Sequence, residues 1–341
     1  MKMMKNILQL GKLNYYLLER LLKSYSNKTD PRLVLGPKLG EDAAVIDYPN
    51  CYLIVTTDPV TFAIGEIGWY TVQVNANDIA TRGATPKWFL ATILLPENKT
   101  TKKLVEEIFS QISRACSQLD ITLIGGHTEI SYNLDRPIIA GFMLGEVCKD
   151  KLVSTSGAKV GDAIILTKGI VIEGTSIIAR EKHKELKKKG YSADFIQKCK
   201  NYIYIPGLSV VKDALLASKF KVHSMHDPTE GGLACGLYEI AQASGVGLLV
   251  EKEKIPILEE SLILCREYSL DPLRTITSGA LLIVASKKEC SRIISLLSEN
   301  GIKAYLIGEI KEQGFGFKIK TDHTLEELKF STKDEITKIF E

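Results

Sequence analysis

The sequence predicts an α+β protein of two domains, each containing a mixed β-sheet with flanking helices. Two observations support this prediction. The 341 residues, of which 45% are hydrophobic, exceed what one compact core usually holds. Strand-like and helix-like segments also interleave in both halves without the strict strand–helix–strand rhythm of a doubly wound sheet. We place the domains at 1–155 and 156–341, with a linker rich in Ser, Thr, Gly and Lys over 151–161.

Helices are predicted where apolar residues recur every three or four positions, and strands where short apolar runs lie between turn residues. In the first half, this pattern predicts a helix over 13–25, strands at 43–46 and 52–55, helices over 69–83 and 102–119, and strands at 121–124 and 138–143. In the second half, it predicts a strand at 163–166, helices over 173–189, 206–217 and 230–244, a strand at 281–284, a helix over 287–299 and a strand at 305–308. Pro206 suits the first position of a helix, and Gly245 suits the residue after a helix end.

The predicted helix over 69–83 has two distinct faces. Apolar residues at helical spacing form one face, and Asn75, Asp78 and Arg82 line the other. An amide, a carboxylate and a guanidinium group therefore lie along one side of the same helix.

Composition and charge exclude several classes of protein. The 44 basic and 41 acidic residues leave a formal net charge of +3, which argues against broad nucleic-acid binding. There is no apolar run of about 18 residues, so we expect no membrane-spanning helix. The seven cysteines are scattered and form no CxxC pair. This usage is typical of reduced thiols, so we expect a cytoplasmic protein without a disulfide framework or a zinc site.

Three aspartates of the first half are the strongest candidates for a metal site. Asp42 lies in a predicted turn, Asp58 follows an apolar run, and Asp78 lies on the polar helix face. Carboxylates gathered in one place repel each other unless a cation neutralises them, and Mg²⁺ prefers oxygen ligands and bridges to phosphate. The chain is therefore predicted to be a magnesium–nucleotide enzyme. Taken singly, each aspartate also fits a turn, a strand-end cap or a solvated helix position.

A glycine-rich segment over 125–129 follows a predicted strand and is expected to form a turn. Gly125 and Gly126 permit a ligand to approach the backbone closely. Imidazole is a poor Mg²⁺ ligand. Three roles are therefore considered for His127: a neighbour of the metal, a phosphate donor or a structural residue. Glu129 is the better metal candidate. An ordinary strand-ending turn remains the alternative for the whole segment.

The segment 227–232 precedes the predicted helix over 230–244. Thr229 suits the N-cap of that helix, and free N–H groups at a helix start attract phosphate. A capped helix entry without any ligand is the alternative. His223 and His226 flank the same turn and are interpreted as structural histidines.

These motifs, in this order, resemble those of one enzyme family over roughly residues 36–310. The family includes aminoimidazole ribonucleotide (AIR) synthetase, thiamine monophosphate kinase, selenophosphate synthetase and the hydrogenase-maturation dehydratase HypE. The similar segments are Gly-Glu-Asp-Ala-Ala at 40–44, Thr-Asp at 57–58, Asn-Asp-Ile-Ala at 77–80 with Gly-Ala-Thr-Pro at 83–86, Gly-Gly-His-Thr-Glu at 125–129, and Asp-Pro-Thr-Glu-Gly-Gly-Leu at 227–233.

The resemblance implies AIR synthase-like N-terminal and C-terminal domains, a homodimer that pairs through the first sheets, and ATP held in a cleft through Mg²⁺. It implies activation of an oxygen as a phosphate ester, with ATP as a substrate and a small molecule as the acceptor. The implied nucleotide contacts are Asp42, Asp58, Asp78, Gly125, Gly126, His127, Thr128, Asp227, Thr229, Gly231 and Gly232. The implied metal ligands are Asp42, Asp58, Asp78, Glu129 and Asp227. No side chain is predicted to act as a covalent catalyst.

Within the family, the chain is most similar to the HypE branch. That branch ends in a tail whose cysteine carries the carbamoyl group, whereas the last cysteine here is Cys290, so we expect no tail carbamoylation. His127 stands where relatives have an acidic residue, and Glu230 stands where HypE-type proteins have arginine, which suggests a different substrate charge. Three functions therefore remain open: a HypE-like enzyme with an unassigned acceptor, a small-molecule kinase of the thiamine monophosphate type, and a non-catalytic nucleotide-binding partner in hydrogenase maturation.

Overall fold

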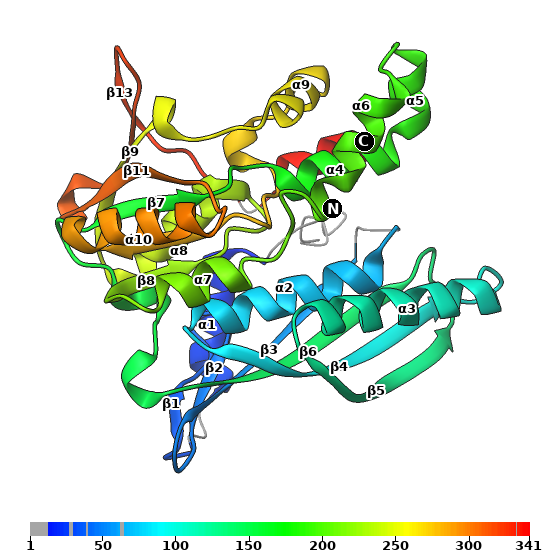
Figure 1. Cartoon of the computed structure of the whole chain (residues 1–341), viewed down its shortest axis with the longest axis horizontal. Coiled ribbons are helices and arrows are strands. Elements are labelled where there is room, and N and C mark those ends of the chain that lie inside the picture. Colours follow the sequence, from blue (N-terminus) through cyan, green and yellow to red (C-terminus); the bar gives the residue numbers. More distant parts are fainter. Residues whose placement is uncertain (1–12, 27–29, 39, 62–64, 332) are drawn as a thin grey trace, which may run out of the picture.

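The computed structural model describes residues 13–26, 30–38, 40–61, 65–331 and 333–341, which form two mixed β-sheets with flanking helices (Figure 1). This arrangement confirms the predicted α+β class. The two sheets follow one another along the chain and do not share a strand.

The first sheet contains the strands β1 (Leu33–Leu35), β2 (Ala44–Asp47), β3 (Tyr52–Val60), β4 (Thr85–Pro96), β5 (Thr122–Ser131) and β6 (Ile138–Val147). Their order is β1-β2-β3-β6-β4-β5, and the pairs are antiparallel except for β4 with β5. Helices α2 (Ile67–Thr81) and α3 (Lys102–Gln118) cover one face of this sheet (Figure 1). On α3, Ile108, Ile112 and Ala115 are buried, as its predicted helical spacing requires.

The second sheet contains the strands β7 (Ala163–Thr167), β8 (Val222–His226), β9 (Gly247–Glu251), β10 (Leu282–Ala285), β11 (Ala304–Lys311), β12 (Phe317–Lys320) and β13 (Leu325–Glu327). Their order is β13-β12-β9-β11-β7-β10-β8, and the pairs are antiparallel except for β12 with β9. The accompanying helices are α4 (Ile172–Glu181), α5 (His183–Lys188), α6 (Ala193–Lys200), α7 (Val211–Ala217), α8 (Gly232–Ser244), α9 (Glu259–Glu267) and α10 (Lys287–Glu299).

Alternate residues of the central strand β7 face two different hydrophobic cores. Ala163 and Ile165 belong to a core shared with α7, α10 and the first sheet. Ile164 and Leu166 belong to a core shared with α4, α8 and α9. All four side chains are almost completely buried, which explains why β7 reads in the sequence as a continuous apolar run.

Helix α2 is buried along its whole length, so its predicted polar face does not meet solvent. Asn77 donates from Nδ2 to the carbonyl of Leu208 at 2.9 Å and accepts at Oδ1 from the N–H of Val210 at 2.8 Å. These bonds tie α2 to the segment just before α7. The three residues of the predicted polar face are buried as well, because α2 lies between the first sheet and the second half of the chain.

Two helices of the second half differ from the prediction. The segment 173–189 divides into α4 and α5, which meet at Lys182. The helix expected to open at Pro206 begins instead at Val211. Between those residues, the carbonyl of Leu208 and the N–H of Val210 bond to the side-chain amide of Asn77 and not to the backbone groups of a helix.

Helix α1 (Tyr15–Tyr25) packs against α8 of the second half. The ring of Tyr15 stacks on Tyr238 with a centroid separation of 5.8 Å, and its hydroxyl donates to Glu239 at 2.7 Å. The domain limits 1–155 and 156–341 stay a prediction. Helix α1, which belongs to the predicted first domain, contacts α8 of the predicted second domain.

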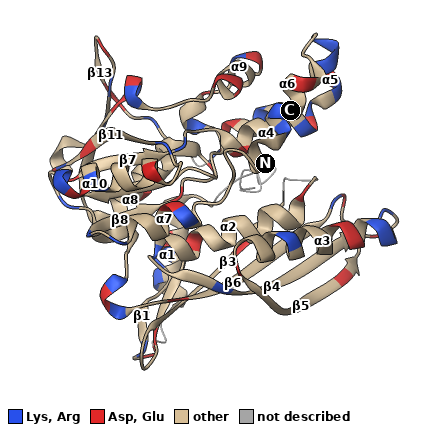
Figure 2. Ribbon diagram, in the orientation of Figure 1, with Lys and Arg blue, Asp and Glu red and all other residues tan. Residues whose placement is uncertain are grey.

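Basic and acidic residues are interspersed on the elements of both layers (Figure 2). Within the part of the chain that the structure describes, no helix has the length and apolar character needed to cross a bilayer.

Candidate functional site

The four predicted aspartates come together where two layers of the molecule meet, one built on the first sheet and the other on the second sheet. Asp42 precedes β2, Asp58 lies within β3, Asp78 lies on α2, and Asp227 follows β8. Burial raises the pKa of Asp78 well above its usual range, and the nearby charges of Asp227, Asp42 and Asp58 raise it further. The four carboxylates therefore repel one another strongly in the absence of a cation.

Hydrogen bonds from neighbouring side chains fix three of these aspartates. The hydroxyl of Thr56 lies 2.8 Å from both the backbone carbonyl of Asp42 and Oδ2 of Asp78. The amide of Asn75 pairs with the backbone of Asp58, accepting from its N–H at 2.9 Å and donating to its carbonyl at 3.0 Å. The predicted polar residues of α2 thus hold the cluster in place.

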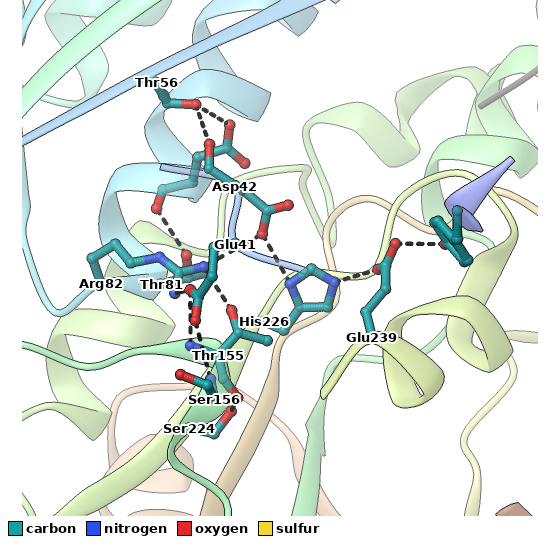
Figure 3. A network of polar contacts seen from close by, with 12 residues as sticks. Glu41, Asp42, Thr56, Thr81, Arg82, Thr155, Ser156, Ser224, His226 and Glu239 are labelled. Atoms are coloured by element: carbon teal, nitrogen blue, oxygen red, sulfur yellow. Dashed lines mark hydrogen bonds and ion pairs between the residues drawn. The ribbon is translucent and has the colours of Figure 1, made fainter. Parts of the chain in front are cut away.

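A buried ion pair anchors the segment that carries Asp42 (Figure 3). The guanidinium of Arg82 pairs with Glu41, and both side chains are fully buried. Arg82 also donates to Thr155 Oγ1 at 2.8 Å and lies 3.4 Å from Asp42 Oδ2. The Glu41 carboxylate accepts the backbone N–H groups of Thr155 and Ser156, each at 3.2 Å. The predicted linker is therefore bonded directly to the Asp42 segment.

Asp227 has the strongest signature of a metal ligand. The residue is 2% exposed, and neither carboxylate oxygen has a hydrogen-bond partner among the described residues. Burial and the charge of Asp42 raise the pKa of Asp227 to about 7, against a smaller opposing effect of His226. Buried carboxylate oxygens are costly to leave unpaired. Their chemistry suits a hard divalent cation, so the residues present fit Mg²⁺.

The interpretation of His226 as a purely structural residue missed its place in the cluster (Figure 3). Its Nδ1 atom lies 3.0 Å from Asp42 Oδ2, and its Nε2 atom lies 2.7 Å from Glu239 Oε2. Burial alone would lower the pKa of His226, but the carboxylates of Asp42 and Glu239 outweigh it and raise this pKa well above its usual range. The only sequence signal was its position next to Asp227.

Glu173, at the start of α4, is a second residue that the sequence did not single out as part of the site. It lines a small cavity of about 40 Å³ together with Asp58, Thr229, Glu230 and other residues of both layers. Its Oε2 atom is buried without a hydrogen-bond partner among the described residues. Burial, with smaller contributions from Glu230 and Asp58, raises the pKa of Glu173 to about 8.

The segment 125–129 does not form the predicted turn but runs through β5 at the edge of the first sheet. Its two glycines are compatible with an extended strand, so they did not require a turn. The ladder pairs Gly126 with Ala91, Ala91 with Gly141, and Gly141 with Asp58. Neighbouring strands lie about 4.8 Å apart, so Gly126 is about 14 Å from Asp58 across the sheet.

His127, Thr128 and Glu129 share this exposed strand. His127 Nε2 lies 3.2 Å from Glu129 Oε2, and the two side chains are 66% and 52% exposed. In this chain, His127 and Glu129 pair with each other and do not join the aspartate cluster. Their roles in nucleotide or metal binding, like those of Gly125 and Gly126, stay predictions.

The entry to α8 also differs from the prediction. The N-cap is Gly231, not Thr229, and its N–H donates to Asp334 Oδ2 at 2.6 Å. The N–H of Gly232 donates to the carbonyl of Thr229 at 3.0 Å. A side chain on Gly232 would meet the carbonyl of Leu273 at 2.7 Å, so packing requires this glycine. The N–H groups of Gly231 and Gly232 therefore bond within the protein, and the predicted phosphate contacts of this turn stay a prediction.

Comparisons with known proteins agree with this architecture. The family model described as "AIR synthase related protein, N-terminal domain" matches residues 40–147, and the model of its C-terminal domain matches residues 159–320. A hydrogenase expression/formation protein of Methanocaldococcus jannaschii is 28% identical over 294 residues, covering 84% of each chain. The carbamoyl dehydratase HypE of Rhizobium leguminosarum is 27% identical over 282 residues, covering 80% of this chain and 77% of the relative. The thiamine-monophosphate kinase of Aquifex aeolicus is 25% identical over 245 residues, covering 69% of this chain and 75% of the relative.

Solved structures share the fold at 22% sequence identity. The HypE–HypF complex superposes with a TM-score of 0.74 over 92% of this chain and 99% of the matched chain. ThiL complexed with AMPPCP and TMP gives 0.73 over 96% and 99%, and HypE in complex with ATP gives 0.72 over 93% and 96%. The two family models together cover most of the chain in the expected order. This chain therefore belongs to the AIR synthase related protein family.

Proposed function

We propose that the chain is a cytoplasmic, ATP- and Mg²⁺-dependent enzyme that activates a carbonyl or amide oxygen of a small acceptor by phosphorylation. The observation that carries the proposal is the convergence of Asp42, Asp58, Asp78 and Asp227, with both oxygens of Asp227 buried and unpaired. The solved complexes of HypE with ATP and of ThiL with AMPPCP support a nucleotide as the ligand. The HypE relatives support the class of acceptor.

The residues of the chain would bind and orient the reactants rather than attack them. The four aspartates would hold Mg²⁺, which supplies charge neutralisation for the phosphates and for the transferred phosphoryl group. Arg82 and Glu41 hold Asp42 in place, and Asn75 holds Asp58. Such positioning accounts for a large share of catalysis in phosphoryl transfer.

Nucleotide binding should depend on the aspartates. We expect Asp58→Asn and Asp78→Asn each to weaken magnesium-dependent ATP binding at least tenfold, about 1.4 kcal/mol, because each removes a charge that holds the cation. Isothermal calorimetry with and without Mg²⁺ would measure this. Asp135→Asn, whose carboxylate is 97% exposed, serves as the control and should bind ATP as the wild type does. Equal ATP affinity in all four proteins would refute the metal-site assignment.

A small-molecule kinase is the second candidate function. It is favoured by the thiamine-monophosphate kinase relative and by the ThiL complex with AMPPCP and TMP. Phosphorus NMR of ATP reactions with a panel of acceptors separates the alternatives. A kinase leaves a stable phosphorylated acceptor, whereas an activating enzyme releases phosphate and a chemically changed acceptor. Binding of ATP without turnover of any acceptor would favour the third function, a non-catalytic nucleotide-binding protein in hydrogenase maturation. The HypE–HypF complex supports a maturation protein as its binding partner.

We also propose that the chain is a homodimer paired through the first sheet. Strand β5 lies at the edge of this sheet, and Ile124 and Ile130 are 51% and 63% exposed. An exposed edge strand with apolar side chains favours pairing with another chain. Light scattering should give about twice the chain mass of 37.8 kDa, and Ile130→Asp should shift it toward the monomer. A wild-type mass near 37.8 kDa at micromolar concentration would contradict the dimer.

A further inference from the structure

We propose that Asp42, His226 and Asp227 form a site for a divalent first-row transition metal ion, with the imidazole Nδ1 as a nitrogen ligand. This inference rests on the proposed function and deepens it, because it assigns one cation of the same cluster to a metal class other than Mg²⁺. Each of the three residues offers one ligand atom, and these atoms lie within 4.8 Å of one another.

The spacing of the ligand atoms suits a coordinated ion. Metal–nitrogen and metal–oxygen bonds of this class are about 2.0–2.2 Å long, so two ligand atoms at right angles lie about 3 Å apart. The distance from His226 Nδ1 to Asp42 Oδ2 is 3.0 Å. The two atoms are therefore already placed as neighbouring ligands of one ion.

Two buried groups at this point have unused binding capacity. His226 is 3% exposed, and its Nδ1 atom makes an ion-pair contact with Asp42 but no aligned hydrogen bond. Asp227 is 2% exposed, and both of its oxygens lack a hydrogen-bond partner among the described residues. An imidazole nitrogen without an aligned hydrogen bond and a carboxylate without a hydrogen-bond partner, both at one buried point, would be satisfied by a single metal ion.

The outer contacts of His226 are those of a metal-binding histidine. Its Nε2 atom lies 2.7 Å from Glu239 Oε2, so the ring can donate its Nε2–H to a carboxylate and direct the Nδ1 lone pair toward the metal. Glu239 is held in turn by the Tyr15 hydroxyl, which donates to its other oxygen at 2.7 Å. Such a carboxylate–histidine arrangement fixes the ring orientation and increases the basicity of the ligand nitrogen.

A nitrogen ligand changes which metals the site prefers. Mg²⁺ is hard and selects oxygen, whereas imidazole favours ions such as Zn²⁺, Fe²⁺ and Co²⁺. Two carboxylates with one imidazole therefore suit a first-row divalent ion, while Asp58 and Asp78 supply only oxygen atoms to the rest of the cluster. The charge of such an ion would also relieve the repulsion between Asp42 and Asp227.

The test uses Mn²⁺ and Co²⁺ as probes of the full-length, EDTA-treated protein. Pulsed EPR of the Mn²⁺ complex should show a directly bound ¹⁴N nucleus, and this coupling should disappear in His226→Gln. Titration with Co²⁺, followed by visible absorption, should give at least tenfold weaker binding in His226→Gln. Glu239→Gln should weaken Co²⁺ binding to a smaller extent, because the ring would lose its carboxylate partner.

His223→Gln is the matched control. It lies three residues away on the same strand, is half-buried, and contacts Asp162 at 2.8 Å and not the cluster. It should keep the ¹⁴N coupling and the Co²⁺ affinity. The inference is overturned if the wild-type Mn²⁺ complex shows oxygen ligands only, a result that needs no variant to fold. Magnesium-dependent ATP binding, measured separately on the wild type, shows whether the proposed function stands in that case.

Discussion

Replacing Arg82 with glutamine is expected to lower the free energy of unfolding by about 3–5 kcal/mol. Arg82 and Glu41 form an ion pair in which both side chains are fully buried. Glutamine cannot neutralise the carboxylate, so Glu41 would remain buried with an uncompensated charge. Two backbone N–H groups would still bind it, but removing one partner of a buried pair is among the costliest single substitutions.

Chemical denaturation of the two proteins at neutral pH would measure this effect. Arg32→Gln is the matched control, because Arg32 pairs with Asp30 on the surface, where the two side chains are 63% and 54% exposed. Exposed pairs contribute at most about 1 kcal/mol, so this variant should be close to the wild type. The double variant Glu41→Gln with Arg82→Gln should lose less than the sum of the two single changes. A loss below about 1 kcal/mol for Arg82→Gln would show that the pair is not buried in solution.

The second large effect concerns the pH dependence of stability, which Glu173→Gln should change. Burial raises the pKa of Glu173 from 4.5 to about 8 in the folded protein. A carboxyl group whose pKa is raised by folding favours the folded state while it is protonated, and this contribution is lost as the pH rises from about 4.5 through about 8. Glutamine does not titrate and keeps a similar shape. The variant should therefore match the wild type near pH 5 and exceed its stability at pH 9.

The expected gain at pH 9 is about 3–5 kcal/mol, because each pKa unit corresponds to about 1.4 kcal/mol. Urea denaturation in EDTA at the two pH values would measure it. Glu106→Gln, on the exposed side of α3 with a carboxylate 65% exposed, is the control and should show no such pH-dependent gain. A wild type and a Glu173→Gln variant that lose stability in parallel from pH 5 to pH 9 would contradict the burial of this carboxyl.

Several features of the fold followed from local sequence patterns. The helical spacing of α3 and α10 and the apolar runs of β7 and β10 predicted elements that the structure confirms. The glycine expected after the last turn of α8 is Gly245, which has a φ of 66°. These features could be predicted because the period of an element and the residue at its end are encoded within a few positions of each other.

Local sequence patterns did not predict the structure where tertiary contacts determine the backbone conformation or the burial of a residue. The Gly-Gly pair at 125–126 permits both a turn and an extended strand, and pairing with β4 selected the strand. The polar face of α2 was correctly placed on the helix, but its burial depends on the second layer packed against it. Thr229 has the side chain of an N-cap, yet Asp334, more than a hundred residues later in the chain, takes the N–H of Gly231.

The sequence by itself determined the fold class, most of the elements and the aspartates that converge at the site, because these depend on residue type and short-range spacing. Only the tertiary structure added Glu41 with Arg82, His226 with Glu239, and the buried Glu173. The partners in these contacts are far apart in the chain, as in the bond from Tyr15 to Glu239 across 224 positions. No local pattern specifies such a pairing, since it arises only when packing of the two layers removes water from both groups at once.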